Sequence, residues 1–282
     1  MSALSIFLAA SCLPSIVLLV YIYNKDKVDK EPTGLLVRLF ILGALSCFPI
    51  AYIESLISGY NTFAEGSVAY NIYDNYLVAG TCEEIGKFLI LFFVTGNSKH
   101  FNCLFDGMIY SVVVSLGFAT LENIMYVASY GFTTALVRAF TAVPGHMFDG
   151  VLMGYFYTMW HFAKRLDETE KRYLERGLIR SIDHSGCRIA YKSQLVLALI
   201  VPIAAHGTYD FLASSNSALG TLLFFAFLIF LYFHCFRKVK KLSNEDTHEM
   251  NMIASVLIKR YPYLYDEIRK QFVAPQNSVV IK

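Results

Sequence analysis

Long apolar runs alternate with short polar segments along most of the chain. A run of about 20 apolar residues is the length that an α-helix needs to cross a bilayer. Because unpaired backbone groups are costly in lipid, such runs are expected to be helical. We predict seven spanning helices, at residues 3–23, 34–57, 75–95, 104–128, 134–160, 193–213 and 218–236. The predicted fold is an all-α, polytopic transmembrane helix bundle.

Two less apolar segments complete the pattern. Residues 161–192 are charged with mixed sign and are expected to form a solvated connector. In residues 244–273 apolar positions recur at roughly helical spacing, interrupted at Pro262, which predicts a cytoplasmic or interfacial helical tail. We therefore divide the chain into a transmembrane domain, residues 1–241, and a tail, residues 242–282.

Composition agrees with the membrane class, since 56% of the 282 residues are hydrophobic. The six cysteines are scattered without a C-x-x-C pair, which predicts neither a disulfide framework nor a thiolate metal site. No basic face of the kind that binds nucleic acid is present. The first apolar run has no basic residue before it and lysines after it, the reverse of a cleavable signal peptide.

The basic residues fall on one side of the predicted membrane. When the connecting segments are placed alternately on two sides, one set holds 21 of the 24 Lys and Arg residues and the other holds none. The remaining three, Arg38, Lys87 and Arg138, lie inside spans. By the positive-inside rule the N-terminus is outside and the C-terminus is cytoplasmic, which requires an odd number of spans.

The third predicted span carries three charged residues, Glu83, Glu84 and Lys87. An ionised group at the centre of a bilayer costs roughly 2.5–3.5 kcal/mol on insertion scales, so the three need compensation. Both carboxylates can reach the ammonium, since they precede it by four and three residues. One lysine cannot neutralise both, so the spare carboxylate needs a proton, a metal or another partner. The alternative is a structural ion pair that steadies the bundle.

Acidic and imidazole side chains on three further predicted spans lie at comparable depth. At the helical rise, Glu83, Glu122 and His206 are about 12, 9 and 10 Å from the outer ends of their spans. Asp210 is about 5 Å from the outer end and His146 about 18 Å. Independent structural pairings would have no reason to share a level, so we expect these side chains to meet.

Local spacing adds to this expectation. His206 and Asp210 are four residues apart, so both can approach one ion or one water, or Asp210 can orient the imidazole. Pro202 would kink the helix near the site, and a Pro-Gly pair directly precedes His146. Glu54, near one end of the second span, is set aside because snorkelling or a single pairing would explain it.

Two chemistries fit this set of residue types. Two imidazoles and a carboxylate can hold a divalent metal while a further glutamate acts as base on a bound water, for example in amide hydrolysis. In a metal-free version, a carboxylate activates water and the histidines stabilise the developing oxyanion. Neither G-x-S-x-G nor H-E-x-x-H occurs in the sequence.

Two other classes of protein remain as alternatives. A proton- or ion-coupled transporter could use the same groups as a relay. However, we find no inverted repeat, and the polar groups cluster towards one side of the membrane. A non-catalytic membrane protein that binds lipid or peptide could also retain the constellation.

Four motifs occur in order on four successive predicted helices, within residues 75–213. They are Glu83-Glu84-x-x-Lys87, Phe118-x-x-x-Glu122-Asn123, Arg138 through Pro144-Gly145-His146 with Gly150 and Gly154, and His206-Gly207-x-x-Asp210. With these motifs the chain resembles the PrsW family of intramembrane proteases and, more distantly, the prenyl-protein (CAAX) endoproteases.

The resemblance implies a multi-pass peptidase of the bacterial cell (inner) membrane. Its substrate would be a single-pass membrane protein, such as an anti-sigma factor, cut near the outer level of the bilayer. Carried over by position, the activating carboxylates would be Glu83 and Glu84. The residues that complete and support the site would be Glu122, His146, His206 and Asp210, with Lys87, Asn123 and Arg138.

Two points of the implied site stay open at this level. If a metal is present, Zn²⁺ or another divalent ion, the candidate ligands are His146, His206, Asp210 and Glu122; a metal-free glutamic mechanism is the alternative. For the base, helical geometry favours Glu83, with Glu84 bound to Lys87.

Overall fold

The computed structural model describes residues 3–182 and 188–272. The regular secondary structure within them is all helical, apart from one isolated bridge between Cys103 and His248. The last ten residues of the predicted tail lie outside the described residues. In chain order the helices are α1 (Ala3–Lys25), α2 (Thr33–Ser58), α3 (Val68–Ile72), the π-helix η1 (Tyr73–Gly80), α4 (Thr81–Thr95), α5 (Asp106–Tyr130), α6 (Phe132–Phe140), α7 (Ala142–Glu175), α8 (Arg188–Ala213), α9 (Ala218–Asn244), α10 (Glu249–Arg260), the 3₁₀ turn η2 (Pro262–Leu264) and α11 (Tyr265–Phe272).

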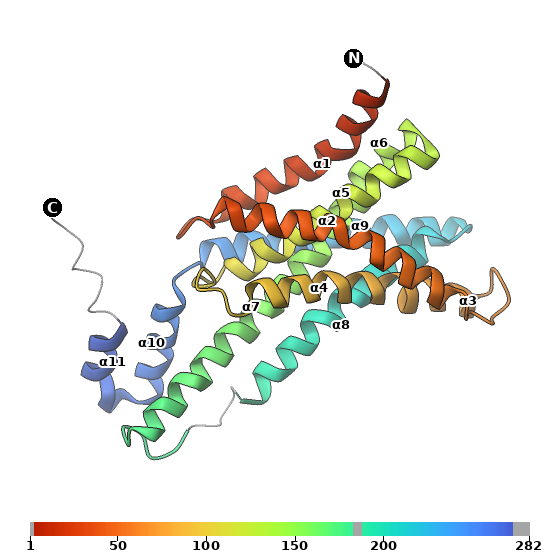
Figure 1. The fold of residues 1–282 in the computed structure, drawn as a ribbon. Helices are drawn as coiled ribbons and strands as arrows, with labels where there is room; N and C mark the ends of the chain where they lie inside the picture. Colours follow the sequence, from red (N-terminus) through yellow and green to blue (C-terminus); the bar gives the residue numbers. More distant parts are fainter. Residues whose placement is uncertain (1–2, 183–187, 273–282) are drawn as a thin grey trace.

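Helix α5 forms the centre of the bundle. Every residue from Asp106 to Thr120 is buried, and the helix packs against α1, α2, α4, α6 and α7 (Figure 1). Among the described residues, five helices are long and apolar enough to cross a membrane: α1, α2, α5, α8 and α9. The prediction of an all-helical membrane protein is therefore confirmed, whereas the count of seven spans and the orientation stay predictions.

Two glycines allow α2 and α5 to cross in direct backbone contact. A Cβ added at Gly43 of α2 would lie 2.2 Å from the carbonyl oxygen of Val114. A Cβ added at Gly117 of α5 would lie 2.2 Å from the carbonyl oxygen of Phe40. Small residues at such crossings let helix backbones pack closely in a membrane, where dispersion replaces the hydrophobic effect as the attraction between helices.

The predicted span 75–95 is part of a longer helical rod that changes its winding. α3, η1 and α4 follow one another without a break from Val68 to Thr95. Where the wider turns of η1 pass into α4, the hydroxyl of Thr81 donates to the carbonyl oxygen of Tyr76 at 2.7 Å. Glu83 and Glu84 then fall in the first turn of α4, directly after the change of winding.

The prediction of a single helix over residues 134–160 is wrong. The chain breaks at Thr141, where φ and ψ are −120° and −76°, and two helices, α6 and α7, meet there. A continuous helix would press the ring of Pro144 against the carbonyl of Phe140, whereas proline is well tolerated in a first helical turn. His146 consequently lies near the start of α7 rather than far along a span.

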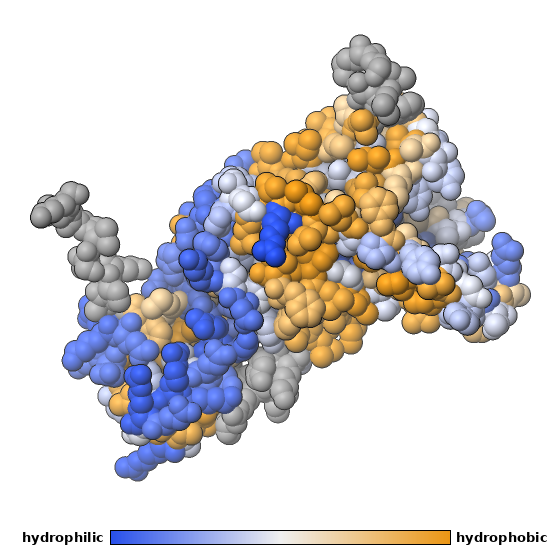
Figure 2. All heavy atoms as spheres, in the orientation of Figure 1, coloured by the Kyte–Doolittle hydropathy of each residue, from blue (hydrophilic) through white to orange (hydrophobic). Residues whose placement is uncertain are grey.

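The expected solvated connector at 161–192 is also partly wrong, because α7 continues to Glu175. Its extension packs against the tail: Glu170 accepts a hydrogen bond from Arg260 at 2.7 Å and one from Tyr261 at 3.2 Å. The tail is interrupted at Pro262, as the sequence predicts. Figure 2 shows hydrophobic residues gathered over α1 and α2, and hydrophilic ones over α10, α11 and the end of α7.

Candidate active site

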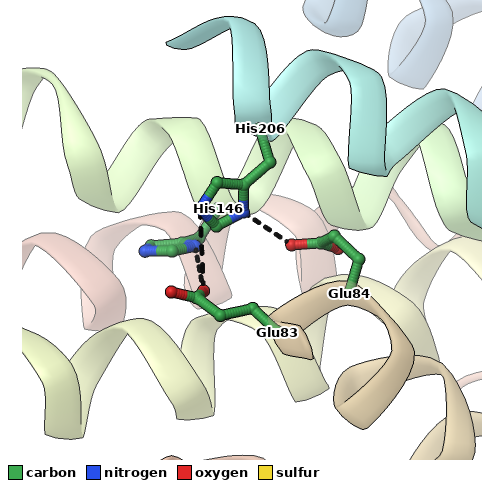
Figure 3. Close-up of side chains that lie close together, drawn as sticks. All are labelled: Glu83, Glu84, His146 and His206. Carbon is green, nitrogen blue, oxygen red and sulfur yellow. Dashed lines mark hydrogen bonds and ion pairs between the residues drawn. The ribbon is translucent and has the colours of Figure 1, made fainter. Parts of the chain in front are cut away.

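Four side chains from three helices meet inside the bundle: Glu83 and Glu84 of α4, His146 of α7 and His206 of α8 (Figure 3). One ligand-type atom from each residue lies within 4.8 Å of the corresponding atoms of the other three, and all four side chains are buried. Nδ1 of His206 lies 2.9 Å from Oε1 of Glu84, and its Nε2 lies 3.8 Å from Oε2 of Glu83. The sequence predicted that these residues converge, and the structure brings them together.

The side chain of Lys87 is fully buried, and its ammonium lies beside three members of this group. It donates to Oε2 of Glu83 at 3.0 Å and to Oε1 of Glu84 at 2.8 Å, and it lies 3.1 Å from Nδ1 of His146. The expected division, with only Glu84 bound to Lys87, is therefore not what the structure has. The two carboxylates differ instead in access, because Glu83 lines a cavity and Glu84 is completely buried beneath it.

Each imidazole has a second carboxylate on its other nitrogen. An ammonium has no acceptor, so Nδ1 of His146 accepts from Lys87, and Nε2 carries the proton and donates to Glu122 at 2.8 Å. Nε2 of His206 lies 3.1 Å from Oδ2 of Asp210. Both rings therefore turn Nδ1 towards the α4 glutamate–lysine group and Nε2 towards a flanking carboxylate.

Glu122 is in turn held by residues that the motifs singled out as supporting. Arg138 of α6 donates to Glu122 at 2.6 Å and to the amide oxygen of Asn123 at 3.0 Å. The amide nitrogen of Asn123 donates to the carbonyl oxygen of Ser11 in α1 at 2.9 Å. This chain of contacts joins α1, α5 and α6 to the imidazole of His146, so its orientation depends on three helices besides its own.

Close packing of α8 against η1 brings His206 to the glutamates. A Cβ added at Gly207 would lie 2.4 Å from the ring of Tyr76 and 3.0 Å from its Cα. A Cβ added at Gly80 would lie 3.1 Å from the carbonyl oxygen of Ile203 and 3.2 Å from the amide nitrogen of Gly207. A side chain at position 207 would therefore clash with η1, which explains why glycine follows His206 in the motif.

A cavity of about 680 Å³ opens onto the site. Glu83, Glu122, His146, His206 and Asp210 all line it. Its walls continue to the ends of α2, η1 and α8 that adjoin the loops predicted to lie outside the membrane; lining residues there are Ser55, Ser58, Asp74, Asn75 and Ser214. The chemistry-bearing side chains are therefore reachable from that end of the bundle.

Two acidic residues of the cavity were missed or set aside in the sequence. Asp149 of α7 is buried, and its Oδ2 lies 3.6 Å from Nδ1 of His206. Its position three residues after His146, on the same helix face, was the available signal. Glu54, set aside as a lone interfacial charge, lines the same cavity from α2.

Comparison with known proteins decides the family. The model of the PrsW family, described as intramembrane metalloproteases, matches residues 31–235, a range that contains every residue of the site except the Ser11 contact. The chain belongs to the PrsW family. The resemblance inferred from the four motifs is thereby confirmed, and the protein is a membrane-embedded peptidase.

Relatives named Protease PrsW align with most of this chain. The protein of Bacillus subtilis (strain 168) is 34% identical over 236 residues, which are 83% of this chain and 94% of that protein. The protein of Geobacillus kaustophilus (strain HTA426) is 32% identical over 234 residues, 83% of this chain and 91% of that protein. The protein of Clostridioides difficile (strain 630) is 30% identical over 247 residues, 86% and 93% respectively. No solved structure matches the chain.

The residues present fit the divalent metal that the family description implies. Imidazole nitrogens and carboxylate oxygens are donors that zinc prefers, and four of them are gathered in one buried group. Metal-binding histidines usually donate their other ring N–H to a carboxylate. Glu122 and Asp210 stand in that position for His146 and His206.

Proposed function

We propose that this protein is an endopeptidase that cleaves a single-pass, membrane-anchored protein near the outer level of the bilayer. The observation that carries this proposal is the buried Glu83, Glu84, His146 and His206 group, placed at the bottom of a cavity. An anti-sigma factor is the substrate that the PrsW resemblance suggests.

Glu83 is proposed as the carboxylate that takes a proton from the attacking water. It faces the cavity, whereas Glu84 is completely buried and bound by both Lys87 and His206. The Lys87 ammonium fixes both carboxylates, so that Glu83 is already oriented when the substrate arrives. A general base is effective largely because it is held in the orientation that proton transfer requires.

The two histidines are proposed as the nitrogen ligands of a metal, completed by carboxylate oxygen from the Glu83–Glu84 pair. Nδ1 of His146 would then bind the metal in place of the Lys87 ammonium, which lies 3.1 Å away. When bound, a divalent ion supplies Lewis-acid activation of water and of the scissile carbonyl. Glu122 and Asp210, considered as ligands on sequence grounds, are instead proposed to hold the imidazoles at Nε2. Their distances of 2.8 and 3.1 Å to the two rings support this role.

The test is cleavage of a labelled single-span substrate by the purified protein in proteoliposomes. Glu83→Gln, Glu84→Gln, His146→Ala and His206→Ala should each abolish cleavage while the protein remains inserted and folded. His234→Ala is the matched control, because this imidazole is exposed on α9 and outside the cavity. Full activity of both His146→Ala and His206→Ala would refute the proposal.

A further inference from the structure

The wall of the cavity carries more negative charge than its cations can balance. Asp74 and Glu54 line it above the catalytic group, in addition to the acidic residues already described. Among the lining residues that the structure describes, the only Lys or Arg is Arg138, and its guanidinium is bonded to Glu122 at 2.6 Å. Lys87 is bonded to Glu83 and Glu84 behind the wall. In the described part of the chain, no Lys or Arg of this cavity is therefore left to pair with Glu54 and Asp74.

Glu54 differs from Asp74 in its hydrogen-bond partners. Its Oε1 is inaccessible to solvent and has no hydrogen-bond partner in the part of the chain that the structure describes. Asp74, by contrast, accepts hydrogen bonds from Ser58 at 3.3 Å and from Asn61 at 3.1 Å. Glu54 as a whole is only half-buried and lines the cavity, so a cationic substrate group can pair with the accessible side of its carboxylate. That pairing should be favourable, because a carboxylate with too few donors in a poorly hydrated site is costly.

The sequence provides no cation of its own near this mouth. Residues 39–86 and 193–236 contain neither Lys nor Arg, and residues 100–163 contain only Arg138. The same segments contain Glu54, Glu65, Asp74 and Asp210 among their acidic residues. Low-dielectric walls focus the field of such a one-sided charge distribution into a cleft and concentrate ligands of opposite sign.

We propose that the cavity selects substrates with a lysine or arginine close to the scissile bond on its outer side, and that Glu54 is the carboxylate that receives this cation. The inference rests on the proposed endopeptidase function. The long side chain of Lys or Arg lets an apolar stem follow the cavity wall while the charged end reaches Glu54. An acidic residue at the same place would face Glu54 and Asp74 and be rejected, which gives specificity through repulsion as well as attraction.

Glu54 is separate from the proposed metal group. It is not among the four residues whose ligand atoms cluster within 4.8 Å. Its replacement should therefore leave the metal content of the purified protein unchanged, and this measurement distinguishes a substrate contact from a metal ligand.

The experiment uses the full chain in proteoliposomes and a labelled single-span substrate whose cut site is first located by mass spectrometry. Ala, Lys and Glu are then placed in turn at the first three positions on the outer side of the cut. We expect kcat/KM at one position at least to be about tenfold higher for Lys than for Ala, and lowest for Glu. Glu54→Gln should bring the Lys-to-Ala ratio close to one, and Glu54→Lys should make Glu the preferred residue.

Glu65→Gln is the matched control, since it removes the same charge from an exposed residue of the α2–α3 loop that does not line the cavity. It should leave the Lys-to-Ala ratio unchanged. Equal cleavage of the Ala, Lys and Glu substrates by the wild type, or an unchanged ratio in Glu54→Gln, would overturn the inference while the peptidase function stands. Cleavage of none of the substrates by the wild type would overturn both.

Discussion

Replacement of Gly207 by alanine should separate His206 from Glu84 without touching either side chain. The new Cβ would lie 2.4 Å from the Tyr76 ring and 3.0 Å from the Tyr76 Cα, whereas ordinary contact begins near 3.4 Å. A flip of the ring moves its Cδ1 but leaves its Cγ, 2.6 Å from the new Cβ, in place. Helix α8 therefore has to move away from η1 by about 0.8 Å to reach ordinary contact. A displacement of this size would stretch the bond between His206 Nδ1 and Glu84 Oε1, now 2.9 Å, beyond hydrogen-bonding distance.

The expected loss of kcat/KM for Gly207→Ala is on the order of 100-fold, because a misplacement of about 1 Å at a catalytic group costs that much. Gly145→Ala is the control. This glycine also adjoins a site histidine, but the nearest atom to its added Cβ is 3.7 Å away, in the ring of Tyr209. Alanine is favoured over glycine in a helix by about 1 kcal/mol, so this variant should keep its activity and unfold at an equal or higher temperature.

Both variants are to be measured for cleavage of the labelled substrate and for thermal unfolding in the same detergent. Adding Tyr76→Ala to Gly207→Ala removes the ring that the new methyl group meets, and should restore part of the activity. Equal activity of Gly207→Ala and Gly145→Ala, or the absence of any rescue in a folded double variant, would refute the steric account of how α8 is placed.

Three further results are expected. Arg138→Gln leaves Glu122, the carboxylate that holds His146, without its guanidinium. It should lower kcat/KM about 10- to 100-fold, as loss of an outer partner of a metal-binding histidine usually does; wild-type kinetics would contradict this. Removal of metal by a chelator should abolish cleavage and re-addition should restore it, checked by metal analysis of the purified protein; activity without metal would favour the glutamic mechanism. Burial raises the pKa of Glu249 from 4.5 to about 7, against the opposing effect of Arg165, so the folded tail binds the proton more tightly than the unfolded one. Its docking should therefore weaken as the pH rises from about 4.5 to about 7, and Glu249→Gln should remove this component from hydrogen exchange of α10 measured against pH.

The hydrophobic pattern predicted the helices well where lipid or a buried neighbour requires continuous apolar sequence. It failed at Thr141 because apolar residues continue on both sides of the break, so hydropathy does not change there. Pro144 was the available signal. It failed again beyond residue 160, because the polar end of α7 is helical through its contacts with the tail, such as Glu170 with Arg260. Contacts between segments so far apart in sequence leave no local periodicity.

For the site, spacing and depth were enough to predict that Glu83, Glu84, His146 and His206 would converge. They could not predict how partners are shared, since that depends on how each helix is rotated in the bundle. Lys87 bonds both glutamates, and Glu54 faces the cavity instead of lipid, for this reason. Asp149 was overlooked although it follows His146 by three residues; its partner, His206, is on another helix and is brought beside it only by the packing of α7 against α8.

The π-helical winding of η1 has a consequence for how much insertion or deletion this part of the chain can accept. Each residue added to or removed from an α-helix turns everything beyond it by about 100°. In Tyr73–Gly80 the register is already shifted from that of an ordinary α-helix. The directions in which Tyr76 and the Glu83–Glu84 pair point relative to each other therefore depend on the number of residues in this segment. Two neighbouring helices fix these directions, one through Gly207 and one through His146. The length of the segment between Tyr76 and Glu83 is thus as much a requirement of the site as the identity of the residues at its two ends.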